Sequence, residues 1–419
     1  MGRCMRVLIV SQHFWPENFR INDLAVGLKD RGHEVTVLAG LPNYPSGRFP
    51  AGYGLRGPWT EEFQGVRILR LPVIPRGDGG GIRMVLNYVS FALAGILLGP
   101  WRCRSRYDVI LASGLSPLTA VLPAIVLKLS HGTPLACWVL DLWPETLSAT
   151  GAIRSSFILG AVERMMRFIY RKCDRILIAS PAFDASIQAH AGRPEQIRYF
   201  PNWAEPDYTA EPTPAPMVAQ LPALPSGFRV MFAGNIGASQ AFGTVLDAAE
   251  RVAEKANVQW IIIGDGRQAP WVHDEVRRRG LTGQVHFLGQ YPSAAMPRFF
   301  AQADAMLVTL KRDPSFALTV PGKIQSYLAS GKPILAALDG AGRRLIEDTG
   351  AGFACPAEDG EGLAAAVLRL VALSEAERTA MGESGRRYCA ANFERNILFE
   401  RIDGWLSEIA STKKAALTE

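Results

Sequence analysis

Short apolar runs alternate with longer amphipathic segments along most of the chain. Runs such as VLIV at 7–10 and RILIA at 175–179 are apolar almost throughout, which is typical of parallel strands that helices cover on both faces. Such regular alternation predicts a doubly wound α/β sheet. In the first half the pattern predicts strands at 6–11, 34–39, 66–71, 109–112, 135–140, 175–179 and 197–200, and helices at 18–31, 82–102, 117–129, 155–171 and 181–189.

A proline-rich segment interrupts this alternation between the two halves. Seven of the 25 residues from Pro201 to Pro225 are proline, which predicts an extended, semi-rigid linker. The alternation restarts with predicted strands at 228–233, 258–263, 284–288, 305–309 and 333–336, and predicted helices at 239–254, 267–278, 293–301 and 322–329. Helices of a C-terminal tail follow. We expect two Rossmann-like domains that face each other across a cleft. Their predicted bounds are 1–200 and 227–390, with a linker at 201–226 and a C-terminal helix at 391–419 that packs back toward the first domain.

Composition and charge exclude several classes of protein. The 419 residues are 48% hydrophobic and 20% charged, which argues against disorder. Residues 1–200 hold 23 basic and 14 acidic residues, which gives +9, and residues 201–419 hold 22 and 25, which gives −3; the net charge of +6 is thus unevenly divided. This asymmetry suggests an anionic partner but not a uniformly basic nucleic-acid-binding protein.

Cysteine and histidine spacing bears on metals and compartment. The six cysteines include no C-x-x-C pair, and the six histidines include no H-E-x-x-H motif. We therefore expect no metal site and a reducing compartment. The N-terminal sequence leads directly into a strand and lacks a signal-peptide pattern, so a cytoplasmic location is expected.

One apolar segment has interpretations that the sequence leaves open. Residues 84–101 carry no charge, and Arg102, Arg104 and Arg106 follow them. The segment could be a buried helix that packs on the sheet. It could also lie at a membrane surface with its arginines near anionic headgroups, and a true membrane span is the least favoured interpretation.

Candidate ligand-binding residues in the first domain follow two predicted strands. The loop at 11–22 follows the first strand, so Glu17, Asn18 and Arg20 stand where ligands bind in doubly wound sheets. Glu17 could equally be an ordinary acidic residue near a helix start. Asp141 and Glu145 follow the strand at 135–140, where a carboxylate could orient a hydroxyl group or act as a general base. The alternative for Asp141 is a helix N-cap.

Glycine-bearing loops follow three strands of the second domain. Such loops let a backbone approach phosphate, and the helix start that follows adds free N–H groups. The alternative is a tight turn that needs glycine for its own geometry. The candidate residues in the first two loops are Gly234, Asn235, Gly237, Ser239, Gly264, Asp265 and Gly266, and the third segment, with Phe287 and Gly289, could present backbone groups to a base.

The strongest local signal is the segment FALTVPGKIQSYLASGKPI at 316–334. Thr319 and Gly322 form a loop, and Lys323 begins a short predicted helix. A lysine at a helix start opposes the helix dipole, unless the lysine and the helix start both point at a pyrophosphate. An exposed lysine of neutral effect is the alternative.

Together these segments resemble the family-4 glycosyltransferases, which have the GT-B architecture of two facing Rossmann-like domains. The resemblance covers almost the whole chain, and within the family it is similar to the bacterial branch that transfers N-acetylfucosamine in O-antigen assembly. It rests on RVLIVSQHFWPE, RGHEVTVL, YDVILAS, DLWPE, FAGNIG, IIIGDG, VHFLG and KIQSYLASGKPI, in this order.

The resemblance implies a retaining sugar transfer without a metal or other cofactor. A nucleotide sugar, expected to be UDP-linked, would bind the second domain, and its sugar could be an N-acetylated deoxyhexosamine. The acceptor would bind the first domain, and Asp141, Glu145 and Lys323 would be the catalytic residues. The basic first half suits a polyprenyl-pyrophosphate-linked saccharide at the cytoplasmic membrane surface, with no nucleic-acid partner. The product would belong to an O-antigen or exopolysaccharide.

This chain departs from the family pattern at positions that matter. The family's two glutamates, separated by seven residues, fall at Leu318 and Ser326. Recognition of the ribose or of the donor sugar would then fall to Gln325, Ser326 or the backbone. The family's arginine and lysine after the first strand of the second domain are replaced within 235–240, so Lys323 would carry more of the pyrophosphate charge.

Other functions stay open at this point. A nucleotide-sugar epimerase of the same architecture would act on the donor alone. A non-catalytic nucleotide-sugar-binding subunit is suggested by the missing glutamates. A dinucleotide oxidoreductase is more remote, because neither glycine loop matches G-x-G-x-x-G.

Overall fold

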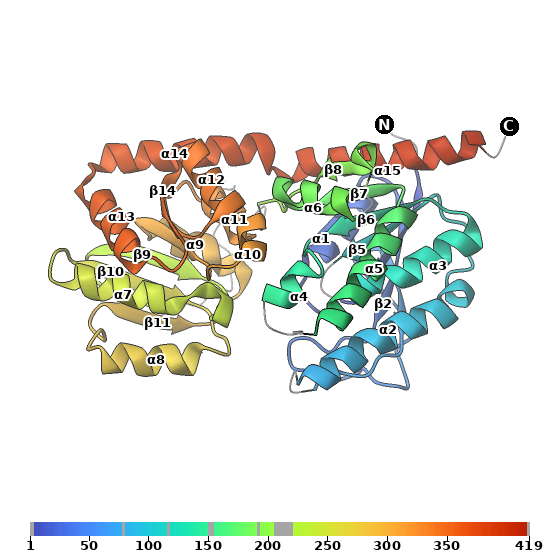
Figure 1. The fold of residues 1–419 in the computed structure, drawn as a ribbon, viewed down its shortest axis with the longest axis horizontal. Coiled ribbons are helices and arrows are strands. Elements are labelled where there is room, and N and C mark those ends of the chain that lie inside the picture. The colour runs from blue at the N-terminus through green and yellow to red at the C-terminus, as the bar shows by residue number, and fades with distance from the viewer. Residues whose placement is uncertain are drawn as a thin grey trace. The chain divides into compact units, whose positions relative to one another are not determined.

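The computed structural model describes residues 4–77, 80–114, 118–149, 155–190, 193–204 and 221–416. They form two compact units (Figure 1). Unit 1 comprises Met1–Pro201 and Leu398–Glu419, and unit 2 comprises Asn202–Ile397. The centre of the predicted linker, 205–220, lies outside the described residues.

Unit 1 is built on an eight-stranded sheet. Its strands are β1 (Arg6–Ser11), β2 (Glu34–Gly40), β3 (Thr60–Phe63), β4 (Val66–Leu71), β5 (Val109–Gly114), β6 (Leu135–Val139), β7 (Arg175–Ile178) and β8 (Ile197–Tyr199). Their order is β3-β4-β2-β1-β5-β6-β7-β8, and β3 and β4 pair antiparallel while the other neighbours are parallel. Every residue of β5 and β6 is buried, because helices cover the sheet on both faces.

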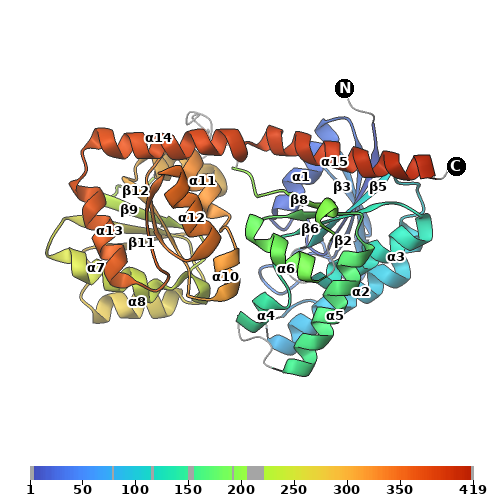
Figure 2. The same ribbon diagram turned by 45° about the horizontal axis from the view of Figure 1, so that its top comes forward.

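Three helices lie side by side on one face of this sheet, α2, α3 and α5 (Figures 1 and 2). The helices of unit 1 are α1 (Arg20–Asp30), α2 (Gly81–Arg102), α3 (Val121–His131), α4 (Glu145–Ala149), α5 (Ser156–Lys172), α6 (Asp184–Ala189) and, from Leu398 onward, α15 (Arg395–Ala416). Short 3₁₀ turns at Leu118–Ala120, Pro181–Phe183 and Pro194–Gln196 complete the unit.

The C-terminal helix α15 is fixed to unit 1 by charged side chains. Asp403 Oδ1 lies 2.9 Å from His33 Nε2, and Glu408 Oε1 lies 2.8 Å from Arg175 Nη2. The chain therefore returns to its first domain after completing the second.

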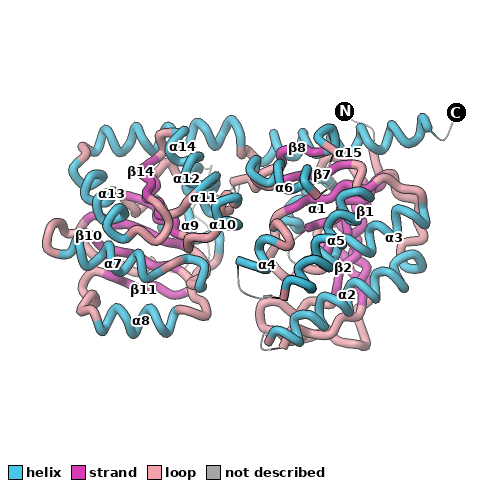
Figure 3. The backbone as a smooth tube through the Cα atoms, viewed as in Figure 1, coloured by secondary structure: helices cyan, strands magenta, loops and turns pink. Residues whose placement is uncertain are grey.

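Unit 2 is built on a six-stranded, fully parallel sheet. Figure 3 draws its strands in magenta and the surrounding helices in cyan. Its strands are β9 (Phe228–Ala233), β10 (Val258–Ile263), β11 (Val285–Gly289), β12 (Ala305–Thr309), β13 (Ile334–Ala337) and β14 (Gly352–Cys355). Their order, β11-β10-β9-β12-β13-β14, is the 3-2-1-4-5-6 order of a Rossmann fold. Both sheets confirm the predicted doubly wound α/β class.

Eight helices of unit 2 cover the two faces of its sheet within the described part of the chain. They are α7 (Phe242–Ala253), α8 (Ala269–Arg278), α9 (Met296–Ala301), α10 (Pro314–Leu318), α11 (Lys323–Ala329), α12 (Gly340–Thr349), α13 (Gly360–Ala372) and α14 (Glu375–Asn392), with 3₁₀ turns at Ala238–Gln240 and Ser293–Ala295. The α14 start is a capping box, in which Ser374 Oγ accepts from the Glu377 amide and Glu377 Oε2 accepts from the Ser374 amide.

Glycine at position 95 lets α2 pack closely against α3. A Cβ at Gly95 would lie 2.4 Å from Pro123 Cγ and 2.6 Å from Pro123 Cβ. The proline ring is rigid and cannot move aside, so the two helices touch only because residue 95 has no side chain.

We expect Gly95→Ala to lower the free energy of unfolding by roughly 1–3 kcal/mol, because overpacking outweighs the higher helix propensity of alanine. The measurement is the urea midpoint. Gly160→Ala in α5 is the matched control, because a Cβ there meets nothing within 4 Å. Equal midpoints for the two variants would contradict this account of the α2–α3 contact.

Candidate active site

The predicted site residues of unit 1 lie on loops at the carboxyl edge of its sheet. The loop at 12–19 follows β1, residues 41–44 follow β2, and Asp141 follows β6. Because these strands are parallel neighbours or near neighbours, their carboxyl ends meet at one edge. The sequence placed the candidate residues at this edge.

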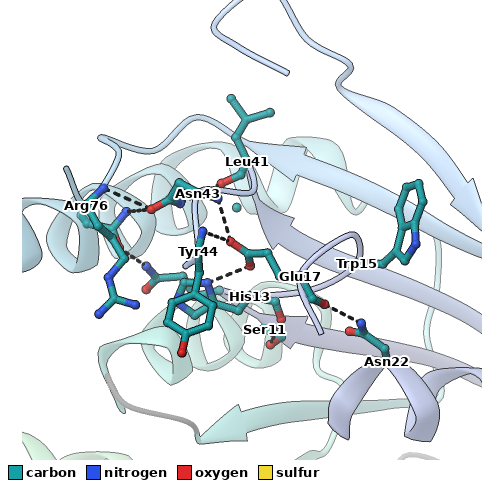
Figure 4. Close-up of polar contacts among 12 residues, drawn as sticks. Ser11, His13, Trp15, Glu17, Asn22, Leu41, Asn43, Tyr44 and Arg76 are labelled. Atoms are coloured by element: carbon teal, nitrogen blue, oxygen red, sulfur yellow. Dashed lines mark hydrogen bonds and ion pairs between the residues drawn. The ribbon is translucent and has the colours of Figure 1, made fainter. Parts of the chain in front are cut away.

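Glu17 is a buried carboxylate with a partner for each oxygen (Figure 4). Its Oε1 accepts from the amides of Asn43 and Tyr44, both at 2.7 Å, and its Oε2 lies 2.8 Å from His13 Nδ1. Its carbonyl also accepts from the side chain of Asn22 at 2.7 Å. Glu17 therefore joins the loop after β1 to the loop after β2.

The same network continues into helix α2 through Asn87, which is fully buried. Its side chain accepts from Gln12 Nε2 at 2.7 Å and donates to the carbonyl of Ile74 at 2.6 Å. It also lies 3.3 Å from Asn43 Oδ1, which accepts from the amide of Arg76 at 3.1 Å. The hydrogen bonds of the Asn87 side chain, on an otherwise apolar face of the helix, thus position α2 against the loops of the carboxyl edge.

The other two predicted acceptor residues differ in exposure. Asn18 is exposed next to Glu17, and Arg20 is the first residue of α1 and half-buried. Phe19, between them, stacks on the ring of His13 with centroids 5.1 Å apart. Their role in acceptor binding stays a prediction.

Asp141 and Glu145 occupy the turn between β6 and α4. Asp141 is half-buried at the end of β6, and α4 begins only at Glu145. Glu145 Oε1 accepts from Ser186 Oγ at 2.5 Å and lies 3.6 Å from His190 Nε2. Its Oε2 is buried and has no hydrogen-bond partner among the described residues. One carboxylate oxygen is thus fixed by Ser186, and the other is buried without such a partner in the described part of the chain.

In unit 2, the loops after β9 and β10 touch backbone to backbone. Gly264 has a φ of +132°, and a Cβ there would lie 1.9 Å from the carbonyl oxygen of Gly234. A Cβ on Gly266 would lie 2.4 Å from the carbonyl oxygen of Ile236. Glycine is required at these positions because the loops leave no space for a side chain.

The amides of the predicted glycines already have acceptors within the unit. Those of Gly234 and Gly264 donate to the carbonyls of Ile263 and Gly289, at 2.9 and 2.8 Å. Those of Gly237 and Gly266 donate to side chains, Gln240 Oε1 at 3.0 Å and Asp265 Oδ1 at 2.7 Å. These glycines shape the loops, and in this structure their amides do not point at a free space.

The helix expected from Ser239 begins instead at Phe242. Residues 238–240 form a 3₁₀ turn, and Ala241 has a φ of 47°, a conformation that alanine rarely adopts. The carbonyl of Gln240 accepts from Thr309 Oγ1 at 2.5 Å, and the carbonyl of Ser239 accepts from the amide of Lys311 at 2.9 Å. The loop is thereby tied to the end of β12.

Lys323 places a buried cation beside these loops. Its Nζ lies 3.7 Å from the ring centroid of Phe232, and a Cβ on Gly234 would be 3.1 Å from it. The nitrogen has no hydrogen-bond partner among the described residues. Burial lowers the pKa of Lys323 to about 7 from its ordinary value of 10.5. An unpaired buried ammonium is costly, and a bound anion would remove that cost.

Tyr327 was not predicted as a site residue, although it lies one helical turn after Lys323. Its hydroxyl donates to the carbonyl of Ala233 at 3.2 Å and accepts from the amide of the same residue at 3.0 Å. Burial raises the pKa of Tyr327 well above its usual range, so the phenol stays neutral. The i, i+4 spacing of two long polar residues on a buried helix was the available signal.

The remaining predicted donor residues are mostly turned inward. Gln325 is fully buried, and the amide orientation that satisfies its hydrogen bonds places its nitrogen 3.0 Å from the carbonyl oxygen of Gly322. Ser326 is buried, and Thr319 Oγ1 donates to the carbonyl of Ser315 at 3.1 Å. Phe287 packs on His273 with ring centroids 3.8 Å apart. Asn235 and Asp265, by contrast, are exposed.

Metal ligands were not expected, and none gather in the part of the chain that the structure describes. No three His, Cys, Asp or Glu side chains there lie close enough together to hold a metal ion. We assign no metal-binding role to any described residue.

Two family profiles match the chain. Residues 18–203 match the family described as "Glycosyl transferase 4-like domain", and residues 227–372 match the one described as "Glycosyl transferases group 1". The two matches divide the chain at the same place as the two units.

Curated relatives match along most of the chain. The "Probable glycosyltransferase WbjE" of Pseudomonas aeruginosa is 27% identical over 320 residues, which covers 74% of this chain and 77% of the relative. The "Putative colanic acid biosynthesis glycosyl transferase WcaI" of Escherichia coli is 23% identical and covers 78% of this chain and 82% of the relative.

Solved structures share the fold at low sequence identity. HepE of Anabaena, determined in complex with UDP and glucose, has a TM-score of 0.66 at 18% identity and covers 96% of this chain and 99% of its own. Sucrose-phosphate synthase of Thermosynechococcus elongatus has a TM-score of 0.73 at 16% identity, with 97% and 100% coverage. Two glycosyltransferase profiles on two Rossmann-like units show that the chain belongs to the family-4 glycosyltransferases with the GT-B fold.

Proposed function

We propose that this enzyme is a retaining glycosyltransferase that moves a sugar from a UDP-linked donor to a lipid-linked saccharide of a bacterial surface polysaccharide. The observation that carries the donor half of the proposal is the buried, unpaired ammonium of Lys323 beside the loop after β9. The names of the colanic acid transferase WcaI and the lipopolysaccharide core transferase LpsE support the pathway, and the UDP complexes of HepE support the nucleotide.

Lys323 would act on the pyrophosphate of the donor. A nucleotide sugar carries negative charge on its two phosphates, and more charge develops on the leaving group as the sugar departs. A cation that is already desolvated interacts with that charge more strongly than a hydrated one, and it needs little reorganisation at the moment of reaction. The exposed side chain of Asn235 and the loops at Gly234 and Gly264 would line the same place.

The reaction needs no separate nucleophile. The acceptor oxygen forms a bond to the anomeric carbon on the face from which UDP departs, and the bond from that carbon to the phosphate oxygen breaks. The proton of the acceptor hydroxyl passes to the departing phosphate. Asp141 would orient the acceptor hydroxyl or the donor sugar, and Glu145, which accepts a hydrogen bond from Ser186, would support the turn that carries Asp141. We propose that no resident metal or other cofactor takes part.

A lipid-linked acceptor places the enzyme at the cytoplasmic face of a membrane, and helix α2 supplies a surface that fits. Within the described residues, α2 is the one helix long and apolar enough to cross a membrane by length and composition. Its inner stripe, which includes Asn87 and Phe91, is buried on the sheet, so α2 would lie on the bilayer and would not cross it. Its outer row is exposed: Ile82, Val85, Leu86, Val89, Leu93, Leu97, Leu98 and Trp101.

One of the three arginines expected at the headgroups has another partner. The guanidinium of Arg102 donates to the carbonyl of Trp59. The charged contribution at this end of α2 therefore rests on Arg104 and Arg106, which are exposed. The apolar row and these two arginines are the features to test.

Lys323→Ala should weaken UDP binding at least tenfold and lower the transfer rate by about 10²–10³, the usual effect of losing one electrostatic contact to a leaving group. Calorimetry with UDP and a transfer assay with lipid-linked acceptors measure the two effects, with and without a chelator. Lys255→Ala, which removes an exposed lysine of the same unit, is the control and should change neither.

Two outcomes of this experiment would favour the alternatives. UDP-sugar binding by the natural enzyme without transfer to any acceptor would indicate a binding subunit. Conversion of the sugar without an acceptor would indicate an epimerase. Unchanged UDP affinity in Lys323→Ala would refute the assigned role of the lysine.

Lys323→Met should stabilise the ligand-free protein below pH 7 and lose this effect at alkaline pH. The lysine binds a proton up to pH 10.5 when unfolded but only up to about pH 7 when folded. Stability of the natural protein therefore rises between these values, and below them the folded state bears the whole desolvation penalty. We expect a gain of several kcal/mol in the free energy of unfolding, measured with urea at pH 6. A gain independent of pH would contradict the assignment.

Leu93→Asp with Leu97→Asp should abolish co-sedimentation with anionic vesicles, because two charges would enter the apolar contact. Leu97 is 74% exposed, so the folded state should tolerate the change. Leu55→Asp, at a loop leucine that is 70% exposed, is the control and should sediment like the natural protein. If the α2 double variant bound vesicles as well as the natural protein, the proposed contact between α2 and the bilayer would be refuted.

A further inference from the structure

A basic pocket lies at the amino edge of the unit 1 sheet, opposite the edge that carries the candidate acceptor loops. It has a volume of about 470 Å³. Its walls include Tyr107 and Asp108, just before β5, and Thr133 and Pro134, just before β6. A residue of α15, Ala410, closes one side. The size is in the range of small-ligand sites.

The residues that line this pocket include two arginines and one aspartate, so their net charge is positive. Arg104, Arg106 and His131 line it, and both arginines are exposed. The carboxylate of the lining residue Asp108 accepts from the backbone amide of Arg6 at 2.8 Å. That carboxylate is therefore directed toward the backbone of β1. Guanidinium groups can bind a phosphate through paired hydrogen bonds, so two arginines in the lining of one pocket supply suitable groups.

The pocket borders the apolar face of α2. The guanidinium of Arg104 lies 5.3 Å from the ring centroid of Trp101, the last exposed residue of the α2 row. Leu129, which is 63% exposed, precedes the lining residue His131 by two positions on α3. A ligand with a phosphate and an attached hydrocarbon could therefore contact the basic pocket and the apolar face together.

The apolar face also extends beyond α2. Phe157, 80% exposed, and Ile158 stand in the first turn of α5, and this end of α5 lies beside the first half of α2 in both views (Figures 1 and 2). Farther along α5, Arg164, Arg167 and Arg171 are exposed. Apolar side chains flanked by arginines on two neighbouring helices match the surface of an anionic bilayer.

We propose that the pocket at Arg104 and Arg106 binds the phosphate headgroup of an anionic phospholipid while the outer face of α2 rests on the bilayer. The inference rests on the proposed function, because that function supplies the location at a membrane surface. The pocket lies at the amino edge, and the candidate acceptor loops lie at the carboxyl edge. The phospholipid is thus an anchor and is distinct from the lipid-linked acceptor.

This anchor would orient unit 1 on the membrane. Helix α2 has 22 residues and is therefore roughly 33 Å long. Its first half meets the acceptor loops through Asn87, and its last turn ends at the pocket through Trp101. The bound headgroup would hold the C-terminal end of α2, and the exposed apolar row would hold the rest of the helix on the bilayer. The acceptor loops would thereby stay at a fixed distance from the bilayer.

The test is co-sedimentation of the full-length protein with vesicles of phosphatidylcholine, with and without phosphatidylglycerol. Replacing both Arg104 and Arg106 by serine should weaken binding to the phosphatidylglycerol vesicles by roughly tenfold or more, because each arginine near an anionic surface strengthens binding several-fold. Arg56→Ser with Arg193→Ser removes the same charge from exposed positions of unit 1 outside the pocket. This control should bind within about twofold of the natural protein.

A charge-conserving variant separates a built site from general attraction. Arg104→Lys with Arg106→Lys keeps both charges but loses the paired hydrogen bonds, so it should also bind more weakly. Full binding by this lysine variant would show that diffuse electrostatic attraction is sufficient, and it would refute the pocket as a binding site. An equal loss of binding in the two serine double variants would refute it as well. Saturating inorganic phosphate should displace little protein from the vesicles. Complete displacement would indicate that the pocket binds free phosphate, and it would refute the phospholipid as its ligand.

These measurements need neither donor nor acceptor, so their failure is distinct from failure of the proposed function. Pocket-dependent vesicle binding by a protein without transferase activity would refute the proposed function alone. Normal transfer by the serine variant in detergent, together with unchanged vesicle binding, would refute the headgroup site alone.

Discussion

The close contact between the loops after β9 and β10 is the constraint on which the candidate donor site depends. With glycine at 234, 264 and 266, the two backbones meet without an intervening side chain. Their amides and carbonyls are bonded to one another and to the end of β11. This leaves one side of Gly234 open for the Nζ of Lys323, which rests on Phe232. A side chain at Gly264 or Gly266 would push the two loops apart, and one at Gly234 would crowd the end of Lys323.

The two units treat buried charge in opposite ways. In unit 1, the carboxylate of Glu17 is buried with three close partners, so its charge is used to fix loops and is already satisfied. In unit 2, the ammonium of Lys323 is buried with none among the described residues. A satisfied charge stabilises the fold, whereas an unsatisfied one favours whatever brings the opposite charge. An anion such as a pyrophosphate is therefore expected to bind unit 2, and unit 1 offers preformed loops.

The sequence predicted the fold well, because strands buried on both faces are apolar without interruption and are easy to recognise. It missed β3 and β14, since TEEF is a polar edge strand and GFAC is four residues long. Within the candidate site, the donor-binding role of Lys323 and of the glycines stays a prediction, although their positions after buried strands followed from the sequence pattern. The sequence could not show that Gln325 faces inward or that Glu17 bonds to residues 26 and 27 positions away, because such contacts depend on the packing of distant loops. Tyr327 was also missed, because its hydroxyl bonds to the backbone of Ala233, 94 positions away, and its spacing from Lys323 was the available signal.

Helix α2 explains why one apolar segment supported two interpretations. Its inner stripe packs on the sheet through small residues such as Gly95, as a core helix does. Its outer row is as apolar as the inner one, although it covers nothing in unit 1. Composition alone cannot separate a buried face from an exposed one when both are apolar. The position of Asn87 does separate them, because an amide fixed to Gln12 and Asn43 marks the face that must stay on the protein. The opposite face is then the one that is left for a membrane.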